Sequence, residues 1–248
     1  MKLAKNIIKP FILFLLILGS VNPAYANEIV FTTHFMKPFT WQEDGEFKGF
    51  ATEIVREMMK IMNHPEKFQM YPFIRGLKEV KSESNRAFFI VARRPEREKM
   101  VKWVGPLVSN GVYFYKKKNS SVKLDSLEDL WNIKSIGVER GVADETFLRS
   151  KGFNNLVTLD NQKQLLQMLN AERIDVGPMG ELVMPEMAKI AGINPNEFER
   201  TAIKLYDSEV NLAFSKDVPD HVVLKWQQAL DDLKASGKYQ EIYQKYLP

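Results

Sequence analysis

The sequence predicts an α/β fold in which helices alternate with parallel strands. From Asn27 to the C-terminus, short apolar runs take turns with amphipathic segments. The 248 residues are enough for one large or two small domains with a proper core. The composition, 45% hydrophobic and 27% charged, is close to the globular average and excludes disordered, collagen-like and coiled-coil chains. A folded α/β protein is therefore expected.

The first half of the chain supplies three predicted strands and one helix. Side chains of one face of the segment Thr52–Met62, such as Ile54, Val55 and Met58, recur at helical spacing. The strands are short apolar runs, at Glu28–Thr33, Ala87–Ala92 and Val112–Tyr115. The polar run Lys116–Ser121 that follows is expected to be a solvated turn.

The second half continues the alternation. A short helix is expected at Ser126–Trp131 behind an Asp125 cap, and Pro185 lies in the first turn of a helix over Glu181–Ala191. The other expected elements are a strand at Ser135–Glu139, a helix at Asn161–Asn170, a strand at Ile174–Val176 and a longer helix at His221–Ser236. Strands and helices thus follow one another along the whole chain.

The N-terminus has the three parts of a secretory signal peptide. Three lysines without any acid precede the apolar run Phe11–Leu18, and Ala24-Tyr25-Ala26 forms an A-x-A cleavage pattern. A membrane anchor is the alternative, but eight strongly apolar residues are far fewer than the ~20 that a spanning helix needs. We predict cleavage of residues 1–26 and a soluble mature protein of 222 residues in the periplasm.

Charge and motifs exclude several function classes. Without residues 1–26 the chain has 32 basic and 31 acidic residues, which gives nucleic-acid binding no electrostatic basis. The absence of cysteine excludes disulfides and thiolate metal sites. His34, His64 and His221 lack metal-binding spacing, and no serine-hydrolase, Walker A or dinucleotide motif is present. We expect no cofactor and no metal, and nothing in the sequence supports an enzyme.

Arginines follow directly on the predicted strand Ala87–Ala92. Arg94 and Arg97 lie at the strand end where open α/β sheets bind ligands, and arginine matches carboxylate and phosphate groups well. The alternative is a solvated turn in which the arginines pair with Glu96 and Glu98. Both interpretations remain open at this point.

The order of motifs resembles the periplasmic solute-binding proteins of family three, the receptors of polar amino-acid ABC importers. The motifs are Pro38-Phe39-Thr40-Trp41, Gly45 with Gly49-Phe50, Arg94-Pro95-Glu96-Arg97, Trp103-Val104-Gly105-Pro106, Ser126 to Leu130, Ile136-Gly137-Val138 with Gly141, and Leu169 to Asp175. They span essentially the whole mature chain. The resemblance implies a type II fold of two α/β lobes joined by two crossing hinge strands. Lobe 1 would comprise residues 27–110 and 210–248, and lobe 2 residues 111–209.

The resemblance also implies where a ligand binds. Arg97 matches the family's carboxylate-binding arginine, and Arg94 and Arg75 stand where they can add positive charge. Phe39, Trp41 and Tyr71 are candidates for the walls of the pocket, although ordinary core packing explains them equally well. The remaining expected ligand contacts are Ala92, Val142, Ala143, Gly180 and Glu181.

Departures from the family pattern affect the expected ligand. Val142-Ala143 replaces a hydroxyl-bearing turn, and Gly180 stands where the family has an aspartate for the α-amino group. Glu181 can take over that role or be an ordinary acid of a first helical turn. The departures favour an anionic or neutral-headed acid over a cationic amino acid.

These features together predict a monomeric, exported receptor. It would capture a small carboxylate-bearing solute, amino-acid-like or an organic acid, between its lobes and deliver it to an ABC permease in the inner membrane. Two alternatives remain: a periplasmic enzyme on the same scaffold that resembles cyclohexadienyl dehydratase, and a sensory ligand-binding module.

Overall fold

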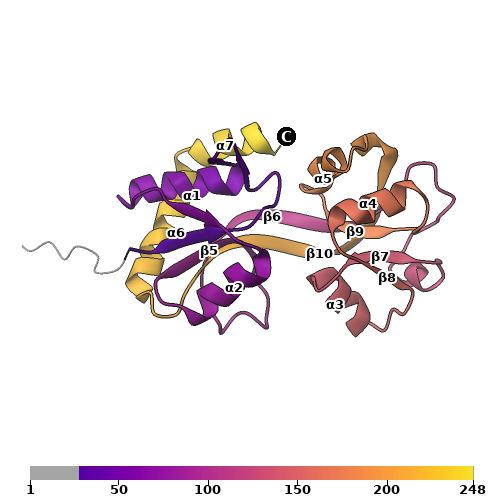
Figure 1. The fold of residues 1–248 in the computed structure, drawn as a ribbon, viewed down its shortest axis with the longest axis horizontal. Coiled ribbons are helices and arrows are strands. Elements are labelled where there is room, and N and C mark those ends of the chain that lie inside the picture. The colour runs from indigo at the N-terminus through magenta and orange to yellow at the C-terminus, as the bar shows by residue number, and fades with distance from the viewer. Residues whose placement is uncertain (1–27, 248) are drawn as a thin grey trace, which may run out of the picture.

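The computed structural model describes residues 28–247 and consists of two lobes connected by two long strands (Figure 1). The predicted signal peptide lies outside the described residues. No helix between residues 28 and 247 has both the length and the hydrophobicity that a membrane crossing requires.

A six-stranded sheet runs through both lobes. Its strand order is β4 (Phe68–Met70), β1 (Val30–Thr33), β5 (Arg86–Ala92), β10 (Phe198–Phe214), β6 (Lys102–Lys117) and β9 (Gly177–Gly180). β1 pairs in parallel with β4 and β5, whereas β10 is antiparallel to β5 and β6, and β9 is antiparallel to β6. The sheet is therefore mixed, and the prediction of a parallel sheet holds only for part of it.

The long strands β6 and β10 connect the lobes. In lobe 1 Lys102 pairs with Phe214, and in lobe 2 Lys117 pairs with Phe198. The predicted strand Val112–Tyr115 is therefore part of a 16-residue strand, β6. Near the middle, Ser109 lies opposite Glu209. The predicted lobe boundaries, after residues 110 and 209, fall in this central part of the strand pair and stay a prediction.

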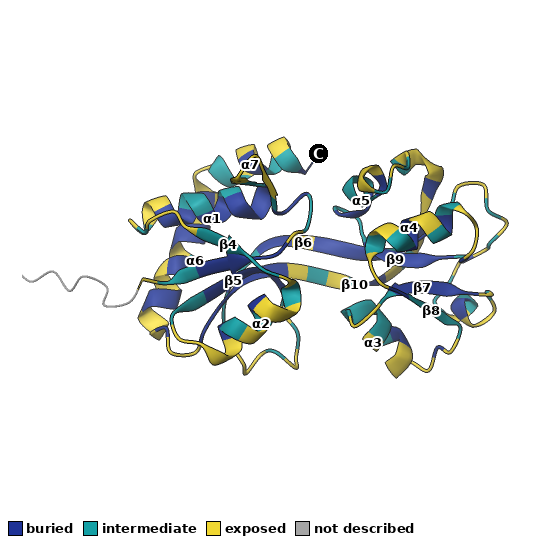
Figure 2. Cartoon of the chain, in the orientation of Figure 1, coloured by how far each residue is buried: buried dark blue, intermediate teal, exposed yellow. Residues whose placement is uncertain are grey.

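Lobe 1 packs its helices around a large apolar core and a smaller second cluster, on which the helix Phe73–Ser82 lies (Figure 2). Trp226 lies against Phe31 and Phe214, with ring centroids 4.9 and 5.9 Å away. Its helices are α1 (Phe50–Ile61), α2 (Phe73–Ser82), α6 (Asp220–Ala235) and α7 (Lys238–Tyr246), and the hairpin β2 (Trp41–Glu43) with β3 (Glu46–Lys48) precedes α1. The apolar stripe Ile54, Val55 and Met58 of α1 faces this core, as its spacing predicts.

Lobe 2 has an apolar cluster on each face of its strands. Along β6, Val112 and Phe114 belong to one cluster and Tyr115 to the other, because successive side chains of a strand point to opposite faces. Its further elements are β7 (Ile136–Glu139), α3 (Ala143–Ser150), β8 (Leu156–Leu159), α4 (Gln162–Asn170) and α5 (Met184–Ile190), with 3₁₀ helices η1 (Glu128–Trp131) and η2 (Pro195–Glu197). We call the cluster of Val112 and Phe114 the α3-side cluster, because it contains Leu148 of α3. The cluster of Tyr115 is the α5-side cluster, because it contains Met184 of α5.

Three predicted elements of lobe 2 differ from the structure. The segment Ser126–Trp131 is only a 3₁₀ turn, in which Asp129 and not Asp125 accepts the backbone N–H bonds of residues 125 and 126. Of Ile174–Val176 only Val176 makes a β-bridge, and the strand β9 follows it. The predicted helix Glu181–Ala191 begins three residues later, at Met184, because Glu181 bonds to β6 instead.

Candidate functional site

Arg97 lies at the end of β5, where lobe 1 faces lobe 2. It belongs to a turn that follows Ala92, and its Nη1 donates to the carbonyl of Ala92 at 3.1 Å. The guanidinium carbon is 5.4 Å from the ring centroid of Phe73, the first residue of α2. The turn and the helix start thus fix the position of the arginine head group.

The charge of Arg97 has no acidic partner. Burial of the half-buried guanidinium and the nearby charge of Arg94 both lower its pKa. Among residues 28–247 no carboxylate forms an ion pair with it. A desolvated cation without a counter-ion is unfavourable, and an anion that binds there removes this cost.

Arg94 makes a polar contact between the lobes. Its Nη2 donates to the hydroxyl of Tyr206 at 3.1 Å, and its guanidinium carbon is 5.3 Å from the Tyr206 ring centroid. The Tyr206 hydroxyl in turn donates to Asp144 in the first turn of α3. Burial, followed by the charge of Asp144, raises the pKa of Tyr206, so this hydroxyl keeps its proton.

Two acids of lobe 2 belong to this part of the site: Asp144, which accepts the bond from Tyr206, and Glu139, which is close enough for the charge of Asp144 to act on it. Burial raises the pKa of Asp144. Glu139, at the end of β7, has its pKa raised to about 7 by burial and by the charge of Asp144. The site therefore has guanidinium groups on lobe 1 and carboxyl groups on lobe 2. The sequence interpretation missed Glu139, Asp144 and Tyr206 as site groups. The departure from the family pattern at Val142-Ala143 lies directly before Asp144, but no sequence signal pointed to Glu139 or Tyr206.

Val142 and Ala143 form the start of α3. Val142 is the extended N-cap residue and no side chain caps it. The turn is held instead by Glu145, which accepts the backbone N–H of Gly141 at 2.8 Å. Val142 and Ala143 directly precede Asp144 at the start of α3, and their expected role as ligand contacts stays a prediction.

Arg75 lies beside Tyr71 at the start of α2. The Arg75 guanidinium forms an ion pair with Glu79 at 2.8 Å and lies 3.9 Å from the Tyr71 ring centroid. The Arg75 side chain is 59% exposed, and its expected contribution of positive charge to the ligand site stays a prediction. The Tyr71 hydroxyl donates to Gln69 at 2.7 Å, directly after β4.

Phe39 is not a pocket wall. Its side chain is fully buried in the lobe 1 core, because the carbonyls of Pro38 and Phe39 cap the first N–H groups of α1 and fix the segment against the helix. A Cβ at Gly49 would lie 2.4 Å from the Phe39 carbonyl oxygen, and Gly49 has φ of 121°, so this close approach needs glycine. Trp41 contacts Tyr246 of α7, with ring centroids 6.0 Å apart, in the hairpin region of lobe 1.

Gly180 and Glu181 mark the end of β9. A Cβ at Gly180 would lie 2.2 Å from the side-chain nitrogen of Asn110, so Asn110 occupies the space that a larger side chain would need. Glu181 forms an ion pair with Arg200 at 2.7 Å and accepts the N–H of Gly111 at 3.2 Å. Arg200 lies over Tyr113, which packs on the α5-side cluster, whereas Tyr206 packs on the α3-side cluster. Glu181 is thus directed away from the Asp144 side of the sheet.

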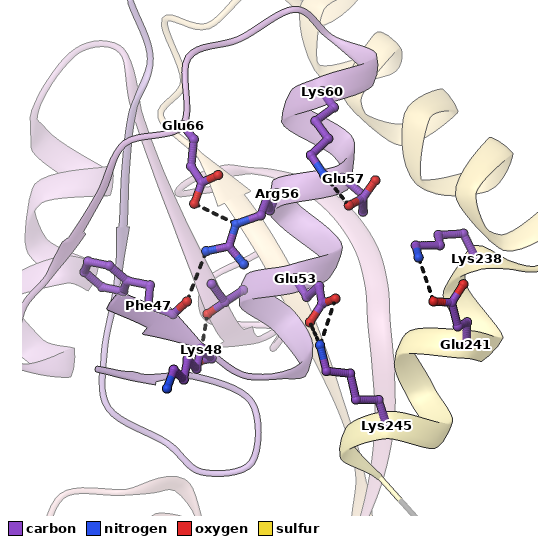
Figure 3. A network of polar contacts seen from close by, with 11 residues as sticks. Phe47, Lys48, Glu53, Arg56, Glu57, Lys60, Glu66, Lys238, Glu241 and Lys245 are labelled. Atoms are coloured by element: carbon purple, nitrogen blue, oxygen red, sulfur yellow. Dashed lines mark hydrogen bonds and ion pairs between the residues drawn. The ribbon is translucent and has the colours of Figure 1, made fainter. Parts of the chain in front are cut away.

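A cavity of about 650 Å³ lies elsewhere on lobe 1, beside the β2–β3 hairpin, α1 and α7. Its three cationic side chains are all paired: Arg56 with Glu66 at 2.6 Å and Lys245 with Glu53 at 2.9 Å within the wall (Figure 3), and Lys48 with Glu43 at 2.8 Å. Arg56 also donates to the carbonyl of Phe47. The first two pairs join α7 and the loop before β4 to α1, and all three make this cavity a poorer anion site than Arg97.

Two lobes on a shared pair of strands, with opposite charges facing each other at the junction, define a two-lobe ligand-binding protein. The sequence profile of the bacterial extracellular solute-binding proteins, family 3, matches residues 29–248. The chain belongs to this family. No group of three or more potential metal-ligating side chains occurs in the described part of the chain.

Individual relatives agree with this assignment. The chain is 27% identical over 251 residues to the arginine-binding periplasmic protein of Mannheimia haemolytica, covering 95% of this chain and 97% of the relative. Its fold is similar to a histidine kinase sensor domain that resembles periplasmic binding proteins, with a TM-score of 0.77, 15% identity and coverage of 88% and 95%. It is also similar to an ancestral arginine-binding protein bound to arginine, with a TM-score of 0.72, 22% identity and coverage of 88% and 98%.

Proposed function

We propose that this protein is an exported receptor that captures a small carboxylate-bearing solute between its lobes. The observation that carries the proposal is Arg97, a half-buried guanidinium without an acidic partner at the junction of the lobes. A carboxylate can accept two parallel N–H bonds from such a group. The ligand would thereby provide the counter-ion that the chain itself lacks at this position.

The acids of lobe 2 support an amino-acid-like solute. Gly180 carries no acid at the family's usual place, where Asn110 fills the space, but Asp144 and Glu139 provide carboxyl groups on the lobe opposite Arg97 and Arg94. A solute with a carboxylate at one end and an ammonium or guanidinium at the other matches this distribution of charge, and it replaces the sequence-based expectation of an anionic or neutral-headed acid. The relative from Mannheimia haemolytica, named for arginine binding, supports the same class of solute.

Membership in the solute-binding family supports the remaining part of the proposal. The receptor would work as a monomer in the periplasm and deliver its solute to an ABC permease in the inner membrane. A solute that touches both lobes stabilises the closed arrangement by its higher affinity for that state. β6 and β10 would act as the hinge, with its axis near Ser109 and Glu209.

A screen for ligands tests the proposal directly. The mature protein is heated with amino acids, organic acids, polyamines and small peptides, and a ligand is recognised by a raised melting temperature. Small-angle scattering with the best ligand is expected to show a smaller radius of gyration than without it. A tight ligand that leaves the scattering curve unchanged contradicts the hinge mechanism.

Glu139 is the observation that bears on the enzyme alternative. A carboxyl group with a pKa of about 7 has the proton affinity of a general acid or base. No nucleophile is hydrogen-bonded to it among the described residues, so we favour binding. Incubation with prephenate separates the two functions: a receptor leaves it unchanged, and turnover that is lost in Glu139→Gln supports the dehydratase-like enzyme.

A further inference from the structure

A second cavity of about 650 Å³ lies at the junction of the lobes, apart from Arg97. Most of its wall comes from lobe 2, where Tyr115 of β6, Met184 of α5 and Phe198 of β10 line it. Tyr243 of α7 comes from lobe 1, and Ser109 lies in the central part of the strand pair, at the edge of lobe 1. In Figure 1 the ribbons of α5 and α7 approach each other above the strand pair, whereas α2 and α3 lie below it.

This cavity lies on the other side of the lobe 2 strands from Arg97 and its neighbours. Tyr115, Met184 and Phe198 all belong to the α5-side cluster. Tyr206, which bonds to Arg94, packs on the α3-side cluster. The cavity is therefore separate from the site of the proposed function.

The hydroxyl of Tyr115 has no hydrogen-bond partner among residues 28–247, and the residue lines the cavity. The ring packs in the α5-side cluster, and Tyr115 as a whole is 3% exposed. Burial raises its pKa to about 12, so the hydroxyl keeps its proton at neutral pH. A group in the cavity can therefore accept a hydrogen bond from this hydroxyl.

Arg200 provides a second donor next to Tyr115, since the two residues face each other across β10 and β6. Its guanidinium is held by an ion pair with Glu181 at 2.7 Å and by the ring of Tyr113, whose centroid is 4.3 Å away. A guanidinium has five N–H donors, so the pair with Glu181 leaves others free. Glu181, the only acid in the cavity wall, is compensated by this pair.

We propose that this cavity is a second binding site, for a small carboxylic acid with an apolar or aromatic body. The carboxylate accepts hydrogen bonds from Tyr115 and Arg200, and the body lies against Met184 and Phe198. The volume is within the ~300–1,000 Å³ of typical small-molecule sites. Tyr243 closes the site from lobe 1, so both lobes contribute to it.

Calorimetry with indole-3-acetate as the probe tests the second site. We expect Tyr115→Phe and Arg200→Gln each to weaken binding about 10-fold or more, because both groups donate to the charged carboxylate. Tyr239→Phe is the matched control: its hydroxyl donates to the carbonyl of Leu107 at 2.7 Å and does not line the cavity, so probe affinity should be unchanged. Tryptamine, which has the same ring system and an ammonium group, should bind at least about 10-fold more weakly than the probe.

Arg97→Ala separates the second site from the proposed function. We expect this variant to bind indole-3-acetate as the unmodified protein does, whatever it does to the solute of the first site. The proposal is overturned if the unmodified protein does not bind the probe, if Tyr115→Phe and Arg200→Gln bind it unchanged, or if Arg97→Ala abolishes binding. Because Tyr115 loses no internal hydrogen bond, Tyr115→Phe should fold and melt like the unmodified protein. Circular dichroism verifies that the variants are folded.

Discussion

Replacement of Arg97 by alanine should abolish most of the affinity for a carboxylate-bearing solute. The guanidinium is half-buried, makes one hydrogen bond to the carbonyl of Ala92, and forms no ion pair with an acid among residues 28–247. A bound carboxylate would complete a partly desolvated charge pair. Removal of one member of such a pair costs about 2–5 kcal/mol, which corresponds to a roughly 30- to 4,000-fold higher dissociation constant.

The folded state should tolerate the same change. Arg97→Ala removes one hydrogen bond, worth about 1 kcal/mol, but it also removes repulsion from Arg94, which lowers the pKa of Arg97. We expect the free energy of unfolding to change by less than about 1 kcal/mol. A large loss of affinity without a large loss of stability would assign Arg97 to ligand binding.

Isothermal titration calorimetry with the best solute from the melting screen measures the effect, and urea unfolding measures stability. Arg93→Ala is the matched control, because this exposed arginine of the same segment pairs with Glu98. Its dissociation constant should stay within about threefold of the unmodified protein, as expected for an exposed pair. The reasoning is refuted if Arg97→Ala binds the solute as tightly as Arg93→Ala does.

Three further outcomes are expected. Glu181→Gln should change solute affinity little, because Glu181 pairs with Arg200 on the opposite side of the sheet. The assignment of the ligand site to Arg97 would be wrong if lysine, arginine or a polyamine binds tightly, Glu181→Gln abolishes this binding and Arg97→Ala leaves it unchanged. Phe39→Ala should lower the free energy of unfolding by about 3–5 kcal/mol in urea titrations, whereas a pocket role predicts normal stability and weaker binding. Because burial raises the pKa of Glu139 to about 7, the folded state holds this proton more tightly than the unfolded chain, and stability should fall as pH rises from about 4.5 to about 7. Glu139→Gln should remove up to about 3 kcal/mol of this loss of stability, and less if solvent screens the carboxyl group. Unfolding experiments at about pH 4.5 and about pH 7 measure the difference, and a pH dependence that the substitution leaves unchanged contradicts the raised pKa.

The local pattern of the sequence determined those elements whose stabilising contacts are close along the chain. The helix predicted at Asn161–Asn170 begins where expected, because the Asn161 side chain accepts the N–H of Gln164 at 2.9 Å. The apolar run Ala87–Ala92 is a central strand, and the arginines after it lie at its end. Hydrophobic periodicity and capping act over a few residues, so they can be read without knowledge of the fold.

The tertiary structure decided which charges are compensated. Arg94 donates a hydrogen bond to Tyr206, which lies 112 positions later in the chain. Tyr206 donates one to Asp144, 62 positions earlier, since α3 packs against the lobe 2 part of β10. Arg200 neutralises Glu181 only because β10 aligns with β6 at one register, which no local pattern specifies. Ion pairs and hydrogen bonds act at short range in space and not along the chain. The sequence therefore identified Arg97 as a candidate, and the packing of the two lobes brought no acid of the described chain into an ion pair with it.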